Sequence, residues 1–346
     1  MVFVSMYAVV IYLLVSPTTV SALSQLSLGI SGPPFVDGID KLRLTTTLTN
    51  TGDETLRVVN DPRSPLSNIP TDTFNIQNAE GAKPEFIGII TKYSPEYGIK
   101  HGDYIILAPG QSTAIEHDLF EGYNFTSSGP GAYTIEASNL FYLADSTNKL
   151  TPTYALTNVY ATHISGSLVV VRPVPFVKRS TFNNCGSTEQ DIVNVSITAA
   201  QTYVSNALDY LQSHNSSTTR YKTWFGEYTA ARHSTLVSSF SKIKTSNFSS
   251  YTYDCSCLDN RYAWVTPSQT GVIHLCNAFF EAHTTGTDSR AGALVHEASH
   301  FTAFAGTVDW ASGQEFCKEL ATDDPDYAIN NADNYQYFAE NNPTLA

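Results

Sequence analysis

Cysteine is absent from the chain before Cys185, and all five cysteines lie at or after that position. Basic runs are absent as well: no stretch of Lys and Arg is longer than the pair Lys178-Arg179, and the net charge of the 346 residues is −13. Nucleic-acid binding is therefore excluded as a function, because the neutralisation of phosphates requires a basic stripe. The uneven placement of cysteine indicates two parts of different construction, and the length fits about two domains.

Long apolar runs are scarce too. The run from Tyr7 to Val15 is shorter than the ~20 residues that span a bilayer, and small residues follow it at Val20-Ser21-Ala22. This order predicts a secretory signal peptide over residues 1–22 and argues against a membrane anchor. We therefore expect a soluble, secreted, extracellular protein. Four Asn-x-Ser/Thr sequons fit a glycosylated one, at Asn124, Asn194, Asn215 and Asn247.

Residues 23–179 predict a β-rich first half. Short runs of β-branched and aromatic residues alternate with turn signals such as Pro109-Gly110, which is typical of a β-sandwich. No catalytic constellation stands out in this half. It ends near Lys178-Arg179, a dibasic pair of the kind that processing proteases of the secretory pathway cut. The expected strands are Leu42–Leu48, Leu56–Val59, Phe86–Thr91, Tyr104–Leu107, Tyr133–Ala137 and Ser167–Val171.

Residues 180–346 predict a mainly α-helical second half. A long amphipathic stretch begins at Ser187, with Gln190 at the spacing of a capping box. Three short β-type runs predict a small antiparallel sheet, at Tyr251–Tyr253, Tyr262–Val265 and Val272–Leu275. Further helices are expected over Glu227–Lys244, Ser289–Phe304 and Gln314–Ala321, and a tail rich in Tyr and Asn follows them.

The segment His296-Glu297-Ala298-Ser299-His300 is the strongest chemical signal in the chain. In an α-helix, residues four apart lie on one face, about 6 Å apart along the axis, so both imidazoles can bind one Zn²⁺. Glu297 then faces the open coordination position, where a carboxylate takes the proton from a metal-bound water. The preceding residues Ala293, Leu294 and Val295 predict a buried helix, in which two unpaired histidines would be costly.

A third protein ligand is needed, and the residues leave its identity open. No histidine follows His300, which excludes the metzincin pattern with its third histidine. Glu315 or Glu319, on the next expected helix, would complete a His-His-Glu set. Asp309, in the segment Gly306-Thr307-Val308-Asp309, would instead complete a His-His-Asp set.

At these residues the chain resembles the aspzincins, the family of the fungal deuterolysins and peptidyl-Lys metalloendopeptidases, and it is most similar to the peptidyl-Lys branch. The likeness covers the second half: H-E-x-x-H and G-T-x-D are accompanied by TFNNC, YLQSH, TWFGEY, ARHST, a CSC pair, TTGTDS and NADN. The resemblance implies a zincin catalytic domain with one Zn²⁺ on His296, His300 and Asp309, and a first half that is a propeptide. It also implies disulfides that join Cys185 to Cys255 and Cys257 to Cys276, which leaves Cys317 as the odd cysteine.

Two positions depart from the family pattern. Lysine-cleaving members recognise the lysine after the scissile bond through acids in a D-N-x-E segment, which here reads Asp333-Asn334-Tyr335-Gln336. Asp333 matches, but Gln336 replaces the second acid, so the resemblance implies a weaker or broader lysine preference. Ser312 stands where the family has a tyrosine that stabilises the oxyanion, and the loss of one such donor costs on the order of 10² to 10³ in turnover.

We expect a secreted zinc metalloendopeptidase, made as a zymogen, that hydrolyses peptide bonds preceding lysine. Its partners are lysine-containing proteins or peptides, and its own propeptide serves as an intramolecular inhibitor or folding aid. That propeptide has no cysteine to block zinc, so it must act sterically, through a carboxylate, or through His101, His117 or His163. The alternative is a secreted zinc-binding protein that keeps the zincin fold with little or no activity, which Ser312 and Gln336 favour.

Overall fold

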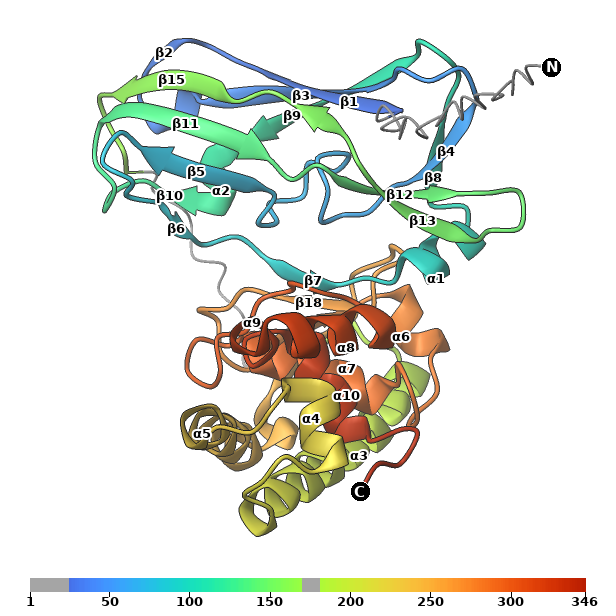
Figure 1. Ribbon diagram of the computed structural model, residues 1–346. Coiled ribbons are helices and arrows are strands. Elements are labelled where there is room, and N and C mark those ends of the chain that lie inside the picture. Colours follow the sequence, from blue (N-terminus) through green and yellow to red (C-terminus); the bar gives the residue numbers. More distant parts are fainter. Residues whose placement is uncertain (1–24, 170–180) are drawn as a thin grey trace, which may run out of the picture.

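The computed structural model describes residues 25–169 and 181–346. A β-rich half lies over a mainly helical half, and strand β7 (Ile90–Lys92) and helix α1 (Pro95–Lys100) lie at their junction (Figure 1). The expected signal peptide and the pair Lys178-Arg179 lie outside the described residues. Within the described residues, no helix has the length and apolar character needed to cross a bilayer.

Two four-stranded sheets of the first half, in the orders β14-β1-β3-β9 and β2-β15-β11-β5, face each other across one apolar core. In the central strand β3 (Arg43–Asn50), Leu44 and Leu48 point into this core, as the period of two in a strand requires. Ile135 and Ile164 reach the same core from the opposite sheet. The other strands are β1 (Leu26–Ser31), β2 (Phe35–Asp37), β5 (Phe74–Asn78), β9 (Ser112–Asp118), β11 (Gly131–Ala137), β14 (Leu156–Thr157) and β15 (Tyr160–Ser165).

A further four-stranded sheet, in the order β13-β12-β4-β8, lies at one end of the sandwich (Figure 1). The strand expected over Ser167–Val171 is wrong for its described residues, because β15 ends at Ser165 and the following Gly166 takes a left-handed φ of 68°. The remaining elements are β4 (Leu56–Val59), β6 (Glu85–Phe86), β8 (Tyr104–Leu107), β10 (Tyr123–Asn124), β12 (Leu140–Ala144), β13 (Leu150–Tyr154), α2 (Leu119–Gly122) and a 3-10 turn at Ile39–Lys41.

The second half is mainly helical, as expected. Its longest helix, α3 (Ser187–Ser213), buries a stripe that includes Val193, Ala200 and Val204. The expected capping box is displaced by one residue, because Gly186 is the N-cap and its N–H donates to the Glu189 carboxylate at 2.6 Å. The other helices are α4 (Thr219–Phe225), α5 (Ala230–Ser246), α6 (Asn277–Glu281), α7 (Arg290–His300), α8 (Gln314–Asp323), α9 (Pro325–Ala328), α10 (Ala332–Glu340) and a 3-10 turn at Phe248–Ser250.

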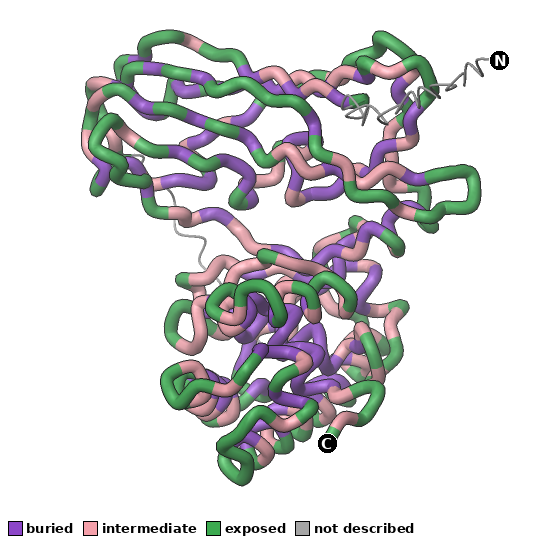
Figure 2. Tube along the Cα trace, in the orientation of Figure 1, coloured by how far each residue is buried: buried purple, intermediate pink, exposed green. Residues whose placement is uncertain are grey.

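Several helices differ from the sequence prediction, which contained none of α4, α6 and α9. Helix α7 ends at His300, before the expected Phe304, because the chain turns back and the Thr307 N–H donates to the Ser299 carbonyl at 3.1 Å. The tail rich in Tyr and Asn contains α10, which no prediction anticipated. Every residue of α10 is buried, the polar Asp333, Asn334, Gln336 and Glu340 included, so its polar side chains do not face solvent as those of a surface helix do. Buried segments gather in the middle of the second half (Figure 2).

The sheet of the second half is mixed and not antiparallel as expected. Its order is β16-β17-β19-β18-β7, and the pairs β16–β17 and β17–β19 are parallel. Parallel neighbours need a long crossover, which α3, α4 and α5 provide between β16 and β17. The fifth strand, β7, comes from the first half, so the expected strand Phe86–Thr91 is divided between β6 and β7. The other strands are β16 (Phe182–Asn183), β17 (Thr252–Asp254), β18 (Ala263–Val265) and β19 (Val272–Leu275).

Disulfides fasten the start of the second half to its sheet. They join Cys185 to Cys255 and Cys257 to Cys276, which are the pairs that the resemblance implied. Cys317 is free and fully buried on α8, so it is not placed to pair with another molecule. The sequon asparagines differ in exposure: Asn124 is half-buried, and Asn194, Asn215 and Asn247 are exposed.

A buried histidine makes the stability of the first half depend on pH. His117 lies in the sandwich core, where Nε2 is 2.9 Å from the Thr46 hydroxyl and the ring packs edge-on against Phe74. Burial lowers the pKa of His117 to about 4. Between about pH 6.5, the ordinary pKa of histidine, and about pH 4, the proton binds to His117 mainly in the unfolded state. Stability is therefore greatest above about pH 6.5 and falls by at most about 3 kcal/mol as the pH drops to about 4.

We predict that His117→Gln removes much of this acid sensitivity, since an amide can donate to Thr46 without titrating. Hydrogen exchange of the β3 and β9 amides, measured between pH 7 and pH 4 after correction for intrinsic rates, would show it. The matched control is His163→Gln, which replaces an exposed histidine of the neighbouring sheet. An unchanged pH dependence in His117→Gln would contradict the assignment.

Candidate active site

Helix α7 carries the two motif histidines through the centre of the second half. Its N-cap is Ser289, whose hydroxyl accepts a hydrogen bond from the Gly292 N–H at 3.0 Å, a cap that contributes about 1 kcal/mol. Gly292 permits a close approach to α10, because a Cβ there would lie 1.9 Å from a carboxylate oxygen of Glu340. These contacts fix the helix in the core, and every residue from Ala291 to His300 is buried.

The motif histidines meet Asp309 at one point. Nε2 of His296 lies 3.3 Å from Oδ1 of Asp309, and Nε2 of His300 lies 3.6 Å from the same oxygen. Both Nε2 atoms and both carboxylate oxygens of Asp309 are buried and have no hydrogen-bond partner. Converging ligand atoms that lack partners are costly unless a cation binds between them, so the cluster fits one metal ion.

The other ring nitrogen of each imidazole lies close to an oxygen atom. Nδ1 of His296 lies 2.8 Å from Oδ1 of Asp333, and Nδ1 of His300 lies 2.8 Å from the carbonyl oxygen of Thr307. A proton on Nδ1 leaves the Nε2 lone pair free for a metal, which is the usual arrangement of histidine ligands. Burial lowers the pKa of His300 to about 4, so this imidazole is neutral, the form that binds metals.

The loop after α7 carries Asp309 back to the histidines. Gly306 adopts a left-handed φ of 62°, which lets the chain reverse after the helix. Val308 forms a β-bridge with Asn331. The Asn331 side chain accepts hydrogen bonds from the N–H groups of the two residues after Asp309, at 2.8 and 3.0 Å. Asp309 is therefore anchored on both sides by the segment that begins α10.

The donor set fits zinc. Two imidazole nitrogens and one carboxylate are ligands that Zn²⁺ prefers, and three protein ligands leave the fourth position of a catalytic site for water. Among the described residues, Glu315 and Glu319 on α8 stay outside the cluster. Of the two ligand sets that the sequence left open, the structure brings the His-His-Asp set together.

Glu297 lies beside this cluster and is fully buried. Its Oε1 accepts a hydrogen bond from the Lys92 N–H at 3.3 Å, and its Oε2 has no hydrogen-bond partner. Burial raises the pKa of Glu297 well above its ordinary value, and the charge of Asp309 adds to the shift. A raised pKa makes a carboxylate a better proton acceptor, so the position suits a general base.

An acidic pocket beside Glu297 holds the side chain of Lys92. The ammonium nitrogen lies 2.8 Å from Oδ1 of Asp333 and 3.8 Å from Oδ1 of Asp288. It also lies 5.5 Å and 5.9 Å from the ring centres of Tyr262 and Tyr337, within cation–π range. Burial by itself lowers the pKa of Lys92, but the charges of Asp333 and Asp288 outweigh burial and raise that pKa. The pocket is thus built for an ammonium group.

Gln336 has a different position from the one that the family pattern suggested. It is fully buried on α10, and its amide donates to Oε1 of Glu340 at 3.0 Å. The second carboxylate near Lys92 comes instead from Asp288, whose Oδ1 also accepts a hydrogen bond from the Tyr337 hydroxyl at 2.7 Å. Sequence reasoning missed Asp288, although it lies in the TTGTDS segment directly before α7.

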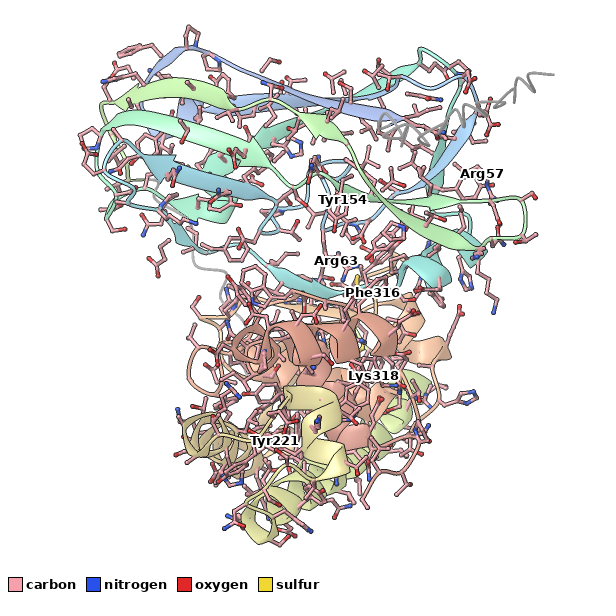
Figure 3. All side chains as sticks on the ribbon, viewed as in Figure 1. Arg57, Arg63, Tyr154, Tyr221, Phe316 and Lys318 are labelled. Carbon is pink, nitrogen blue, oxygen red and sulfur yellow. A yellow bond between two sulfur atoms is a disulfide. The ribbon has the colours of Figure 1, made fainter. Side chains whose placement is uncertain are left out.

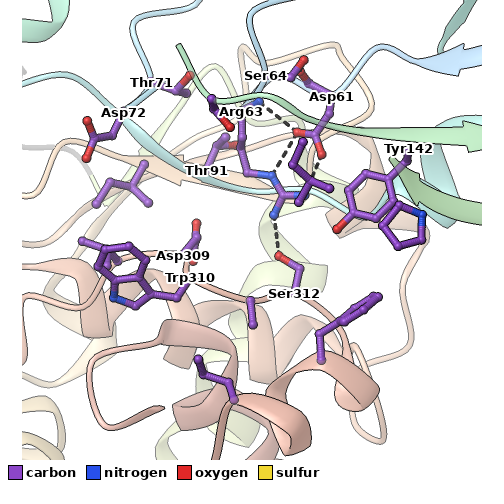
Figure 4. Close-up of a pocket in the computed structure, with 18 of the residues that line it drawn as sticks. Asp61, Arg63, Ser64, Thr71, Asp72, Thr91, Tyr142, Asp309, Trp310 and Ser312 are labelled. Atoms are coloured by element: carbon purple, nitrogen blue, oxygen red, sulfur yellow. Dashed lines mark hydrogen bonds and ion pairs between the residues drawn. The ribbon is translucent and has the colours of Figure 1, made fainter. Parts of the chain in front are cut away.

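Ser312 contacts the first half of the chain. Its hydroxyl accepts a hydrogen bond from Nη1 of Arg63 at 2.5 Å, and Arg63 also pairs with Asp61 at 2.8 Å. These residues line a cavity of about 730 Å³ that Asp309 and Trp310 also line (Figure 4). Figure 3 places Arg63 at the junction of the halves, above α8. The short side chain of Ser312 therefore ends on a residue of the first half.

The three histidines of the first half lie away from the ligand cluster. His117 is inside the sandwich, His163 is exposed, and Nε2 of His101 lies 3.4 Å from a carboxylate oxygen of Glu281. None of them joins the cluster of His296, His300 and Asp309 that the described residues form. The first half instead places Lys92 in the acidic pocket beside Glu297, and no local pattern in the sequence marks this residue.

Comparison with known proteins gives the family. A family model described as lysine-specific metallo-endopeptidase matches residues 210–340. A peptidyl-Lys metalloendopeptidase from Grifola frondosa is 49% identical over 345 residues, which cover 98% of this chain and 99% of that protein. The chain belongs to the aspzincin metalloendopeptidases.

Two further relatives match about half of this aspzincin. A peptidyl-Lys metalloendopeptidase from Pleurotus ostreatus is 52% identical over 168 residues, which cover 48% of this chain and 100% of that protein. A solved zinc peptidase from Grifola frondosa is 50% identical, with a TM-score of 0.47, and its match covers 47% of this chain and 100% of that chain. The family resemblance drawn from the sequence is confirmed, and this aspzincin is a metal-dependent hydrolase of peptide bonds.

Replacement of Asp309 by alanine should weaken zinc binding by about 100-fold or more, because one of three ligands is lost. Titration against a competing zinc chelator would measure the affinity, with metal content checked by mass spectrometry. Glu319→Ala on α8 is the matched control and should bind zinc like the parent. Zinc loss in Glu319→Ala together with retention in Asp309→Ala would instead support the His-His-Glu set.

Proposed function

We propose that this aspzincin is a secreted zinc endopeptidase that cleaves peptide bonds preceding lysine, and that residues 23–179 are its propeptide and residues 180–346 its catalytic domain. The proposal depends on one juxtaposition, in which the cluster of His296, His300 and Asp309 lies beside a pocket that stabilises an ammonium group. The cluster provides for hydrolysis, and the pocket provides for recognition of the side chain that follows the scissile bond.

The residues around the cluster have separate roles in the reaction. A single Zn²⁺ on His296, His300 and Asp309 would polarise the scissile carbonyl and acidify the attacking water. Glu297 takes a proton from that water and returns it to the nitrogen of the leaving amine. Asp333 keeps His296 in the orientation and tautomer that direct Nε2 at the metal. Burial of the helix excludes bulk water from these groups.

Recognition of lysine follows from the charge of the pocket. Asp333 and Asp288 give it two carboxylates, and the rings of Tyr262 and Tyr337 flank the space where an ammonium lies. Because Asp288 supplies a second carboxylate, the change to Gln336 does not leave Asp333 alone. The names of the fungal relatives support a preference for lysine.

Division into propeptide and enzyme has independent support. The family model matches only within the second half, and about half of this chain accounts for the whole of the Pleurotus relative. The dibasic pair Lys178-Arg179 falls between the two described parts of the chain. Export is supported by the apolar N-terminal run and by the disulfides of the second half. The first half then acts as an intramolecular inhibitor or folding aid.

The proposal is tested by the cleavage profile of the zinc-loaded, processed protein on a library of peptides. We expect cuts on the amino side of lysine that a chelator abolishes and added zinc restores. Glu297→Gln should retain zinc but lose about 10²- to 10⁴-fold in turnover, since a general base is removed. Random cleavage, or full activity in Glu297→Gln, would refute the assignment.

Ser312 provides the test of the alternative, a zinc-binding protein with little activity. We predict that the natural protein turns over lysine peptides and that Ser312→Tyr raises the rate by up to about 10²-fold, because a phenol donor is restored. Ser312→Phe, which adds the ring without the hydroxyl, should give no gain. An inert natural protein that becomes active only as Ser312→Tyr would favour the non-catalytic reading.

A further inference from the structure

We propose that strand β7 occupies the substrate cleft as an acyl-lysine peptide would, with Lys92 in the place of the substrate lysine, and that Lys92 thereby keeps the intact chain latent. This inference rests on the lysine preference proposed above and adds the means by which the first half controls the site. Three contacts of β7 carry it: the backbone ladder, the amide nitrogen of Lys92 and the ammonium group of Lys92.

The backbone of β7 extends the sheet of the enzyme half. It pairs antiparallel with β18, where Lys92 is opposite Ala263 and Thr91 is opposite Trp264, and the Lys92 carbonyl accepts a hydrogen bond from the Tyr262 N–H at 2.9 Å. In the described residues β7 pairs with no strand of its own half, as Figure 1 shows. Without β7, β18 would be the edge of the sheet, and exposed edges bind extended peptides.

The Lys92 amide lies where a leaving amine belongs. Its N–H donates to Oε1 of Glu297 at 3.3 Å, and Glu297 is the residue that must return a proton to the nitrogen of the cleaved bond. In a peptide cut before lysine, that nitrogen is the amide nitrogen of the lysine. The Thr91–Lys92 peptide bond therefore occupies the position that a scissile bond would take.

The position of the Lys92 ammonium group gives the same alignment of β7 with the site, independently of the backbone contacts. Lys92 is 5% exposed, and its charge is paired with Asp333 at 2.8 Å. A buried charge without a partner is costly, so the Asp333 carboxylate and the Lys92 ammonium stabilise each other across the two halves. A substrate lysine needs the same carboxylate, so it can enter only after Lys92 has left.

The residues before Lys92 cover the metal-ligand side of the cleft. Thr91 and Ile90 line the same cavity as Asp309, and the hydrogen bond from Arg63 to Ser312 closes this side. The first half therefore blocks the binding of a peptide on both sides of the Thr91–Lys92 unit. No histidine, thiolate or carboxylate of the first half is needed for latency.

The test uses the full chain with Lys178 and Arg179 both changed to Gln, so that the halves stay joined. We expect this zinc-loaded chain to be nearly inactive on a short acyl-lysine peptide. Addition of Lys92→Gln should raise its activity by about tenfold or more. Loss of the buried ion pair with Asp333 shifts the population from the state in which β7 fills the cleft toward a state in which the cleft is free. Lys83→Gln, an exposed lysine of the same half, is the matched control and should stay inactive.

A second readout does not depend on zinc or activity. In the metal-free chain, acylation of lysine amines followed by peptide mass spectrometry should label Lys92 at least about tenfold more slowly than Lys83, because its amine is buried and ion-paired. Asp333→Asn should speed the labelling of Lys92 and leave that of Lys83 unchanged. Equal labelling of Lys92 and Lys83 in the parent chain would overturn the inference.

The failure of this inference differs from the failure of the proposed function. Suppose that the processed protein cleaves before lysine but that the uncleavable chain with Lys92→Gln is no more active than its parent. The inference that β7 binds as a substrate does is then wrong, and the assignment as an enzyme stands. If the processed protein binds zinc but cleaves no lysine peptide, the proposed function fails, whatever the labelling of Lys92 shows.

Discussion

The carboxylate of Asp333 joins the parts on which this molecule depends. Its Oδ1 contacts Nδ1 of His296 and the ammonium of Lys92, each at 2.8 Å, and its Oδ2 accepts a hydrogen bond from the Gly313 N–H at 2.9 Å. Burial alone would raise the pKa of this carboxyl, but Lys92 and His296 outweigh burial and hold the pKa well below its usual range. A buried anion is stable only with such partners, so α7, α10, β7 and the loop before α8 are held together around it.

One oxygen therefore serves two tasks of the site. Orientation of the His296 imidazole toward the metal and capture of an ammonium group depend on the same Oδ1. The distance between the metal-ligand cluster and the lysine pocket is consequently fixed by a single side chain at the start of α10. When a lysine ammonium binds in the pocket, the peptide bond before that lysine lies beside Glu297. This follows because Glu297 and the pocket both contact the same extended strand.

The first half fits this arrangement because it makes three kinds of contact with the second half. It gives an edge strand to a sheet that otherwise ends at β18, a cation to an acidic pocket, and Arg63 to Ser312. These contacts come from two segments of the first half, strand β7 and the loop that carries Arg63. The cysteine-free first half thus has a physical means of covering the metal-ligand cluster without providing a ligand to it.

The sequence by itself determined the chemistry carried by local periodicity and by family motifs. The spacing of His296 and His300 placed both on one face of a helix, with Glu297 between them, because 3.6 residues make one turn. The β-rich and helical halves followed from period-two and amphipathic patterns. Helix α10 was not predicted because its polar residues are buried against partners from other segments, and a segment rich in Asn and Tyr otherwise suggests a loop. The mixed sheet was not predicted because strand direction depends on the crossovers between strands.

Only the tertiary structure decided which distant groups meet. The choice of Asp309 over Glu319 depended on a left-handed turn at Gly306 and on its anchoring near α10. The meeting of Asp288 and Lys92 at one ammonium site joins segments far apart in the chain. Buried charges that pair across the fold leave no periodic pattern in the sequence. The partner that offsets the desolvation cost of each charge comes from a distant segment and not from neighbouring residues.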